Sequence, residues 1–63
     1  MKKPNLNIIG LGIGEAASVI EGAGYTFRVV MRDGKPCIGT RDLRSDRLNL
    51  TMTNKVITSY EVG

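Results

Sequence analysis

Arginine and aspartate side chains are interspersed along one polar segment, residues 35–47, which separates two apolar stretches of the chain. Three arginines recur there at intervals of three residues, with two aspartates among them: Arg41, Arg44 and Arg47, with Asp42 and Asp46. Guanidinium groups and carboxylates this close in sequence can hold a loop in an extended shape through ion pairs. We therefore predict a binding loop over residues 33–47. The alternative is a solvated, mobile connection, because exposed ion pairs contribute only about 0–1 kcal/mol each.

These charged residues form no conventional catalytic set. The chain has no histidine, which excludes Ser/His and Cys/His dyads. Asp42 and Asp46 are flanked by arginines, which stabilise the charged form of a carboxylate, so neither suits a general acid at neutral pH. We predict that the protein is not an enzyme and has no small-molecule substrate.

A glycine-rich segment, Gly10-Leu11-Gly12-Ile13-Gly14, precedes a predicted helix in the manner of a dinucleotide-binding loop. That fingerprint is G-x-G-x-x-G. The residue three positions after Gly12 is Glu15, whose carboxylate would repel a pyrophosphate. We expect the glycines to shape the start of the helix, and we predict no cofactor.

Cys37 is the single cysteine of the chain. It can form no intramolecular disulfide, and a zinc site needs about four nitrogen or sulfur ligands, so we predict no metal. Lys35 would favour the thiolate of a reactive Cys37. The alternative is an incidental cysteine that can link two chains, and we expect a monomer or weak dimer. A free cysteine without a leader favours the cytoplasm, and a secreted location requires that a leader was removed.

Charge and hydropathy argue against two further classes of partner. The net charge is +3, four of the nine basic residues lie in residues 35–47, and Tyr25, Phe27 and Tyr60 lie outside that segment. Single-strand binding sites combine a basic groove with stacking aromatics, so we do not expect a nucleic-acid partner. No apolar run approaches the roughly 20 residues of a membrane span, so we expect no membrane partner.

Hydrophobic periodicity predicts one helix and about three strands in a single domain, residues 1–63, with a loose entry arm at residues 1–7. A helix is expected over residues 13–23, where apolar residues recur at helical spacing. Strands are expected over residues 25–32, 48–52 and 56–62, the last two antiparallel. Asp33-Gly34 suits a hairpin turn, but Pro36 cannot donate to a ladder, so we expect a loop there rather than a return strand.

These elements predict a two-layer α+β domain in which the helix covers one face of the sheet. The predicted core consists of the inward-facing apolar residues Ile13, Ala16, Ile20, Phe27, Val29, Leu48, Leu50 and Met52, with Ile57 or Val56.

One run of residues is specific enough to suggest a family. Residues 40–48 read Thr-Arg-Asp-Leu-Arg-Ser-Asp-Arg-Leu and match the order T-x-[DE]-[LY]-R-x-[DN]-R-[VL], and Val62-Gly63 matches a terminal V-G pair. With these residues the chain resembles the potato inhibitor I family, the disulfide-poor serine protease inhibitors that include leech eglin and the barley chymotrypsin inhibitor. The likeness covers most of the chain, but only the nine-residue run is specific.

The resemblance implies a helix on a small three- to four-stranded mixed sheet, with a long exposed loop joining two parallel strands. That loop would enter the cleft of a trypsin- or subtilisin-like serine protease as a substrate mimic, with Arg41–Asp42 as the scissile bond. The implied reactive-site loop is Gly39, Thr40, Arg41, Asp42, Leu43 and Arg44. Arg47 matches the family's arginine that bonds back to the two side chains on either side of the first scissile residue, here Thr40 and Asp42. Asn49 stands where a second supporting arginine is common.

A second reading of the same fold remains open. The chain would then be a non-enzymatic interaction module that uses the basic loop or a sheet edge to bind a partner other than a protease.

Overall fold

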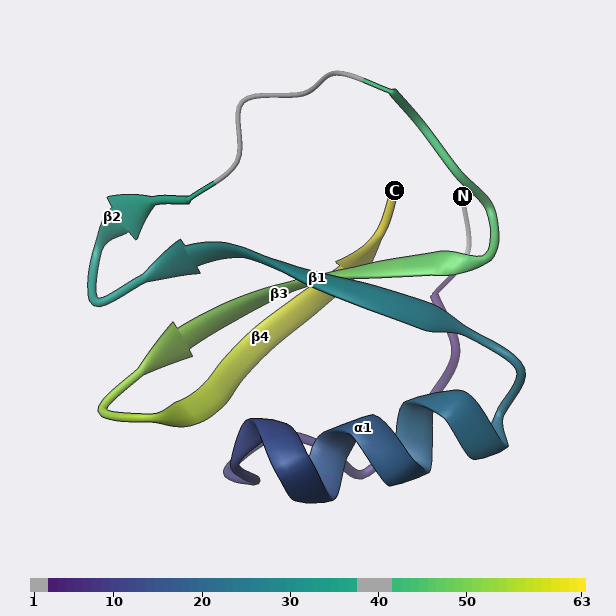
Figure 1. The fold of residues 1–63 in the computed structure, drawn as a ribbon, viewed down its shortest axis with the longest axis horizontal. Helices are drawn as coiled ribbons and strands as arrows, with labels where there is room; N and C mark the ends of the chain where they lie inside the picture. Colours follow the sequence, from purple (N-terminus) through teal and green to yellow (C-terminus); the bar gives the residue numbers. More distant parts are fainter. Residues whose placement is uncertain (1–2, 38–41) are drawn as a thin grey trace.

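A computed structural model describes residues 3–37 and 42–63, and it confirms the predicted α+β fold. The described elements are a helix, α1 (Ile13–Gly22), and strands β1 (Thr26–Arg32), β2 (Lys35–Pro36), β3 (Arg47–Thr53) and β4 (Val56–Val62). The strands form one sheet in the order β2-β1-β3-β4, in which β1 and β3 are parallel and the other pairs antiparallel. The helix covers one face of this sheet (Figure 1).

The helix begins and ends where the glycines allow it. Gly12 is the N-cap and offers no side-chain hydrogen bond. Gly24 has φ of +86°, a left-handed conformation that costs glycine little. Its N–H donates to the Glu21 carbonyl, and the Tyr25 N–H donates to the Ile20 carbonyl, which together make a Schellman motif. The helix therefore ends at Gly22, one residue before the predicted end.

The core lies between α1 and the sheet, and β3 contributes most to it. Along β3 alternate side chains are buried, as the sequence pattern predicted. The buried residues are Ile8, Ala16, Ile20, Leu48, Leu50, Met52, Ile57 and Tyr60. Phe27 and Val29 are only partly buried, and Ile13 is wrongly predicted as core. Ile13 is the first residue of α1 and is 37% exposed beside Met52 and Lys55 at the turn end of the sheet.

The prediction of a loop over residues 33–36 is wrong, because the chain forms a tight hairpin there. Asp33 and Gly34 have φ of +52° and +79°, as a two-residue turn of the primed type requires. Lys35 pairs with Arg32, and Pro36 pairs with Met31. The Cys37 N–H then donates to the Val30 carbonyl at 2.9 Å. In an antiparallel pair hydrogen-bonded positions alternate, so Pro36 occupies the position that needs no N–H donor.

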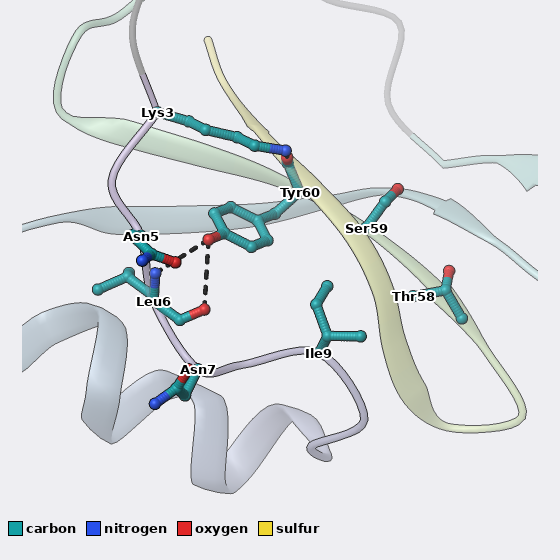
Figure 2. Close-up of a pocket in the computed structure, with 8 residues that line it drawn as sticks. All are labelled: Lys3, Asn5, Leu6, Asn7, Ile9, Thr58, Ser59 and Tyr60. Carbon is teal, nitrogen blue, oxygen red and sulfur yellow. Dashed lines mark hydrogen bonds between the residues drawn. The ribbon is translucent and has the colours of Figure 1, made fainter.

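The entry arm, described from Lys3 onward, is tied to β4 by Tyr60. The Tyr60 hydroxyl lies 2.9 Å from the Pro4 carbonyl and 3.2 Å from the Leu6 carbonyl, and it accepts a bond from the Leu6 N–H. Figure 2 shows the Tyr60 ring beside the arm and below the Lys3 side chain; the Lys3 ammonium is 4.9 Å from the ring centre. These contacts bring the fully buried Ile8 onto the core.

Candidate functional site: the loop before β3 and its support

Residues 42–46 are exposed and lie on the side of the sheet opposite α1 (Figure 1). Of the predicted reactive-site residues, Asp42, Leu43 and Arg44 belong to this segment, whereas Gly39, Thr40 and Arg41 lie outside the described residues. Leu43 is 78% exposed, the highest value among the exposed large apolar side chains of the described residues. The segment therefore presents one apolar side chain among charged neighbours.

Arg47, the first residue of β3, connects the segment to the end of the chain. Its Nη1 donates to Asp42 Oδ2 at 3.1 Å, and its Nη2 donates to the Asp42 carbonyl at 2.9 Å. Its Nε and Nη2 also donate to the Gly63 carbonyl, at 3.1 and 2.8 Å. The Arg47 side chain is only 12% exposed, and its bonds to Gly63 are partly buried, whereas Asp42 is 57% exposed and its bonds to Arg47 are open to water. The predicted contact between Arg47 and Asp42 is present, and the expected contact with Thr40 falls outside the described residues.

Gly63 closes this network from the far side. Its N–H donates to the Arg47 carbonyl at 3.0 Å, which continues the antiparallel ladder between β3 and β4. A Cβ at position 63 would lie 2.5 Å from Asn49 Nδ2, closer than two such atoms approach. The absence of a side chain at Gly63 therefore leaves space for Asn49.

A second arginine, Arg28, reaches Asp42 from the neighbouring strand. It lies outside residues 35–47 and was not among the predicted site residues. Arg28 of β1 stands beside Asn49 of β3 in the parallel register. Its Nε donates to Asn49 Oδ1 at 2.7 Å, and its Nη1 lies 3.5 Å from Asp42 Oδ1. Alternation along β1 was the available signal, because it places Arg28 on the face opposite Phe27 and Val29.

Arg44 and Asp46 pair with each other instead of with the sheet. Arg44 Nε and Nη2 donate to the two carboxylate oxygens of Asp46 at 3.1 and 3.2 Å. The hydrogen bond from Arg44, and then its charge, lower the pKa of Asp46, and the same hydrogen bond raises the pKa of Arg44. Both side chains are more than half exposed, so this pair adds little stability.

The segment is also joined to β1 through its backbone. The Asp46 carbonyl accepts the Thr26 N–H at 2.8 Å and lies 3.3 Å from the Thr26 hydroxyl. Thr26 and Arg47 are partners at the start of the parallel pair. Residues 42–46 are thus held at Asp46 by a backbone contact and at Asp42 by side chains.

Other features offer less for chemistry. The described part of the chain holds no group of three His, Cys, Asp or Glu side chains placed to bind a metal ion. Cys37 is exposed, and its Sγ lies 3.7 Å from the Lys35 carbonyl. Among residues 3–37 and 42–63, no helix has both the length and the apolar character needed to span a bilayer.

A groove of about 500 Å³ runs between the entry arm and β4 (Figure 2). Its walls carry both polar and apolar side chains from the arm and from residues 58–60. Lys3 at its rim is already engaged, because its ammonium contacts the Tyr60 carbonyl and Glu61. Among the described residues that line the groove, none offers an unengaged charge with which to orient a ligand.

No protein-family model, curated protein or solved structure matched this chain when it was compared with each.

Proposed function

We propose that the protein is a non-catalytic serine protease inhibitor that presents residues 39–44 to a protease as a substrate mimic, with Arg41–Asp42 as the scissile bond. The observation that carries the proposal is the double attachment of Arg47, which binds both the side chain and the backbone of Asp42 while it is anchored on Gly63. Asp42 would be the residue on the leaving side of the scissile bond.

Such support favours inhibition over cleavage for a physical reason. A segment already held in its bound shape loses little conformational entropy when it docks. If the bond is cut, the bonds from Arg47 to Asp42 would keep the new amino end in place, where it can rejoin the other end. Arg41 suits the acidic specificity pocket of a trypsin-like enzyme.

The test is an inhibition assay of trypsin and of subtilisin, combined with mass spectrometry of the inhibitor. We expect inhibition of at least one enzyme at micromolar protein, with slow cleavage confined to Arg41–Asp42. The chain has nine lysines and arginines, so the position of the first cut is diagnostic for trypsin.

Rapid digestion of residues 38–46 without inhibition of either enzyme would refute the proposal. An interaction module with a different partner would then be the better reading of the fold.

A further inference from the structure

We propose that Arg28, oriented by Asn49, is a second positioning residue for the loop, so that Asp42 is held from two adjacent strands. This inference rests on the proposed function for its consequence in inhibition, but the contacts that support it are independent of any protease.

The Arg28 guanidinium contacts both Asn49 and Asp42. Its Nε–H points to Asn49 Oδ1 at 2.7 Å, which is a short hydrogen bond, and its Nη1 faces Asp42 Oδ1 at 3.5 Å. Nε and Nη1 belong to one planar group, so fixing Nε on Asn49 also fixes the direction of Nη1. The Arg28 side chain is 16% exposed, which limits the alternative rotamers that solvent would allow.

The two oxygens of the Asp42 carboxylate are contacted by two different arginines. Arg47 takes Oδ2 and Arg28 takes Oδ1, and the two arginines come from β3 and β1. One contact would let the carboxylate swing about a single bond. Two contacts from neighbouring strands restrict both its position and its orientation.

Asparagine suits position 49 better than arginine would. An arginine there would place another cation beside Arg28 and Arg47, and like charges at this distance repel. Asn49 is short and neutral, it accepts from Arg28, and its Nδ2 fits the space that Gly63 leaves. The second supporting cation is therefore Arg28 of β1, whereas the resemblance implies an arginine on β3 at position 49.

The test is a double-mutant cycle with Arg28→Ala, Asn49→Ala and the combined variant. Arg32→Ala is the matched control, because this substitution removes the same charge from the same strand. Arg32 lies at the turn end of the sheet beside Asp33 and Met52, away from Asp42. Three quantities are measured: the cleavage rate of residues 38–46 by subtilisin, the free energy of unfolding, and the hydrogen-exchange rate of the Arg28 Nε–H by NMR.

We expect each single variant to raise the cleavage rate about three- to tenfold, with no further increase in the combined variant, because both act through one contact. Arg28→Lys keeps the charge but lacks the fork, so it should resemble Arg28→Ala. The Nε–H of Arg28 should exchange slowly in the parent protein and fast in Asn49→Ala. Arg32→Ala should leave the cleavage rate unchanged.

Additive effects of Arg28→Ala and Asn49→Ala, or a cleavage rate that rises only in proportion to lost global stability, would overturn the inference. Fast exchange of the Arg28 Nε–H in the parent protein would overturn it as well. If the parent protein inhibits neither protease while the cycle behaves as expected, the proposed function fails and the second support stands.

Discussion

The two faces of the sheet are held by different forces, although the same strands build both. Toward α1, β3 directs Leu48, Leu50 and Met52 into a dry core. On the opposite face the alternate residues Arg47 and Asn49 are half-buried and take part in directional hydrogen bonds. Burial of apolar area stabilises the fold as a whole, whereas the arginine contacts act on one short segment. Global stability and the rigidity of the loop should therefore respond to different substitutions.

The largest expected effect on stability comes from the apolar face. Ile8→Ala would remove a fully buried side chain of the core at the residue that directly follows the entry arm. We expect a loss of about 2–5 kcal/mol in the free energy of unfolding, measured by chemical denaturation. Ile9→Ala is the matched control, because Ile9 is 55% exposed and should cost far less. Equal losses for the two variants would contradict the assignment of Ile8 to the core.

The second prediction concerns the opposite face. Arg47→Ala would remove the two bonds from Arg47 to Asp42, together with its two bonds to the Gly63 carbonyl. We expect cleavage at Arg41–Asp42 by trypsin to rise about 100-fold, since hydrogen bonds to charged groups contribute about 1.5–3 kcal/mol. Inhibition assays and mass spectrometry measure the effect. A variant that resists cleavage as well as the parent protein would break the distinction between the two faces.

A smaller effect is expected from Tyr60→Phe, which keeps the buried ring and removes only the hydroxyl. The hydroxyl joins Pro4 and Leu6 of the arm to β4. We expect a loss of about 1–2 kcal/mol in the free energy of unfolding and no change in the cleavage rate of the loop. An increase in loop cleavage without a loss of stability would show that the arm and the loop are coupled.

The smallest effect is the pH response of the Arg44–Asp46 pair. The pKa of Asp46 is lowered in the folded protein, so its contribution to stability is present at neutral pH and is lost as the pH falls through that lowered value. An NMR titration should give Asp46 a midpoint below that of an ordinary aspartate. Arg44→Gln should raise the midpoint, and Arg32→Gln should leave it unchanged. An unchanged midpoint in Arg44→Gln would mean that the pair does not persist in solution.

Local patterns predicted the elements that follow one simple period. The alternation along β3 and the helical spacing of Ala16 and Ile20 both matched the buried faces. Tyr60 was missed because a bulge interrupts the alternation of β4. Leu50 pairs with Tyr60 and Met52 pairs with Ile57, so both residues of β4 face the core although they are three positions apart.

The candidate site was predictable only where its contacts are close in sequence. Arg47 and Asp42 are five residues apart; charge spacing predicted ion pairs within the loop, and the resemblance indicated this particular pair. Arg28 and Asn49 are 21 residues apart, and they meet only because β1 and β3 are neighbours in the sheet. The order of the strands in the sheet cannot be predicted from the spacing of apolar residues within one strand. The hairpin at Asp33-Gly34 was misjudged for a related reason, since the effect of Pro36 depends on which pairs are hydrogen-bonded.

The most direct test of the central claim is the backbone order of Leu43 in the free protein, measured by ¹⁵N relaxation in the parent chain and in Arg47→Ala. Leu43 is exposed, so its backbone order depends on the attachments of the segment at Asp42 and Asp46, and Arg47→Ala removes the bonds from Arg47 to Asp42 while it leaves the Asp46 contact intact. The account predicts an order parameter near that of the sheet, about 0.85, which falls below about 0.6 in the variant. A low value in the parent protein, or the same high value in both, would contradict the account.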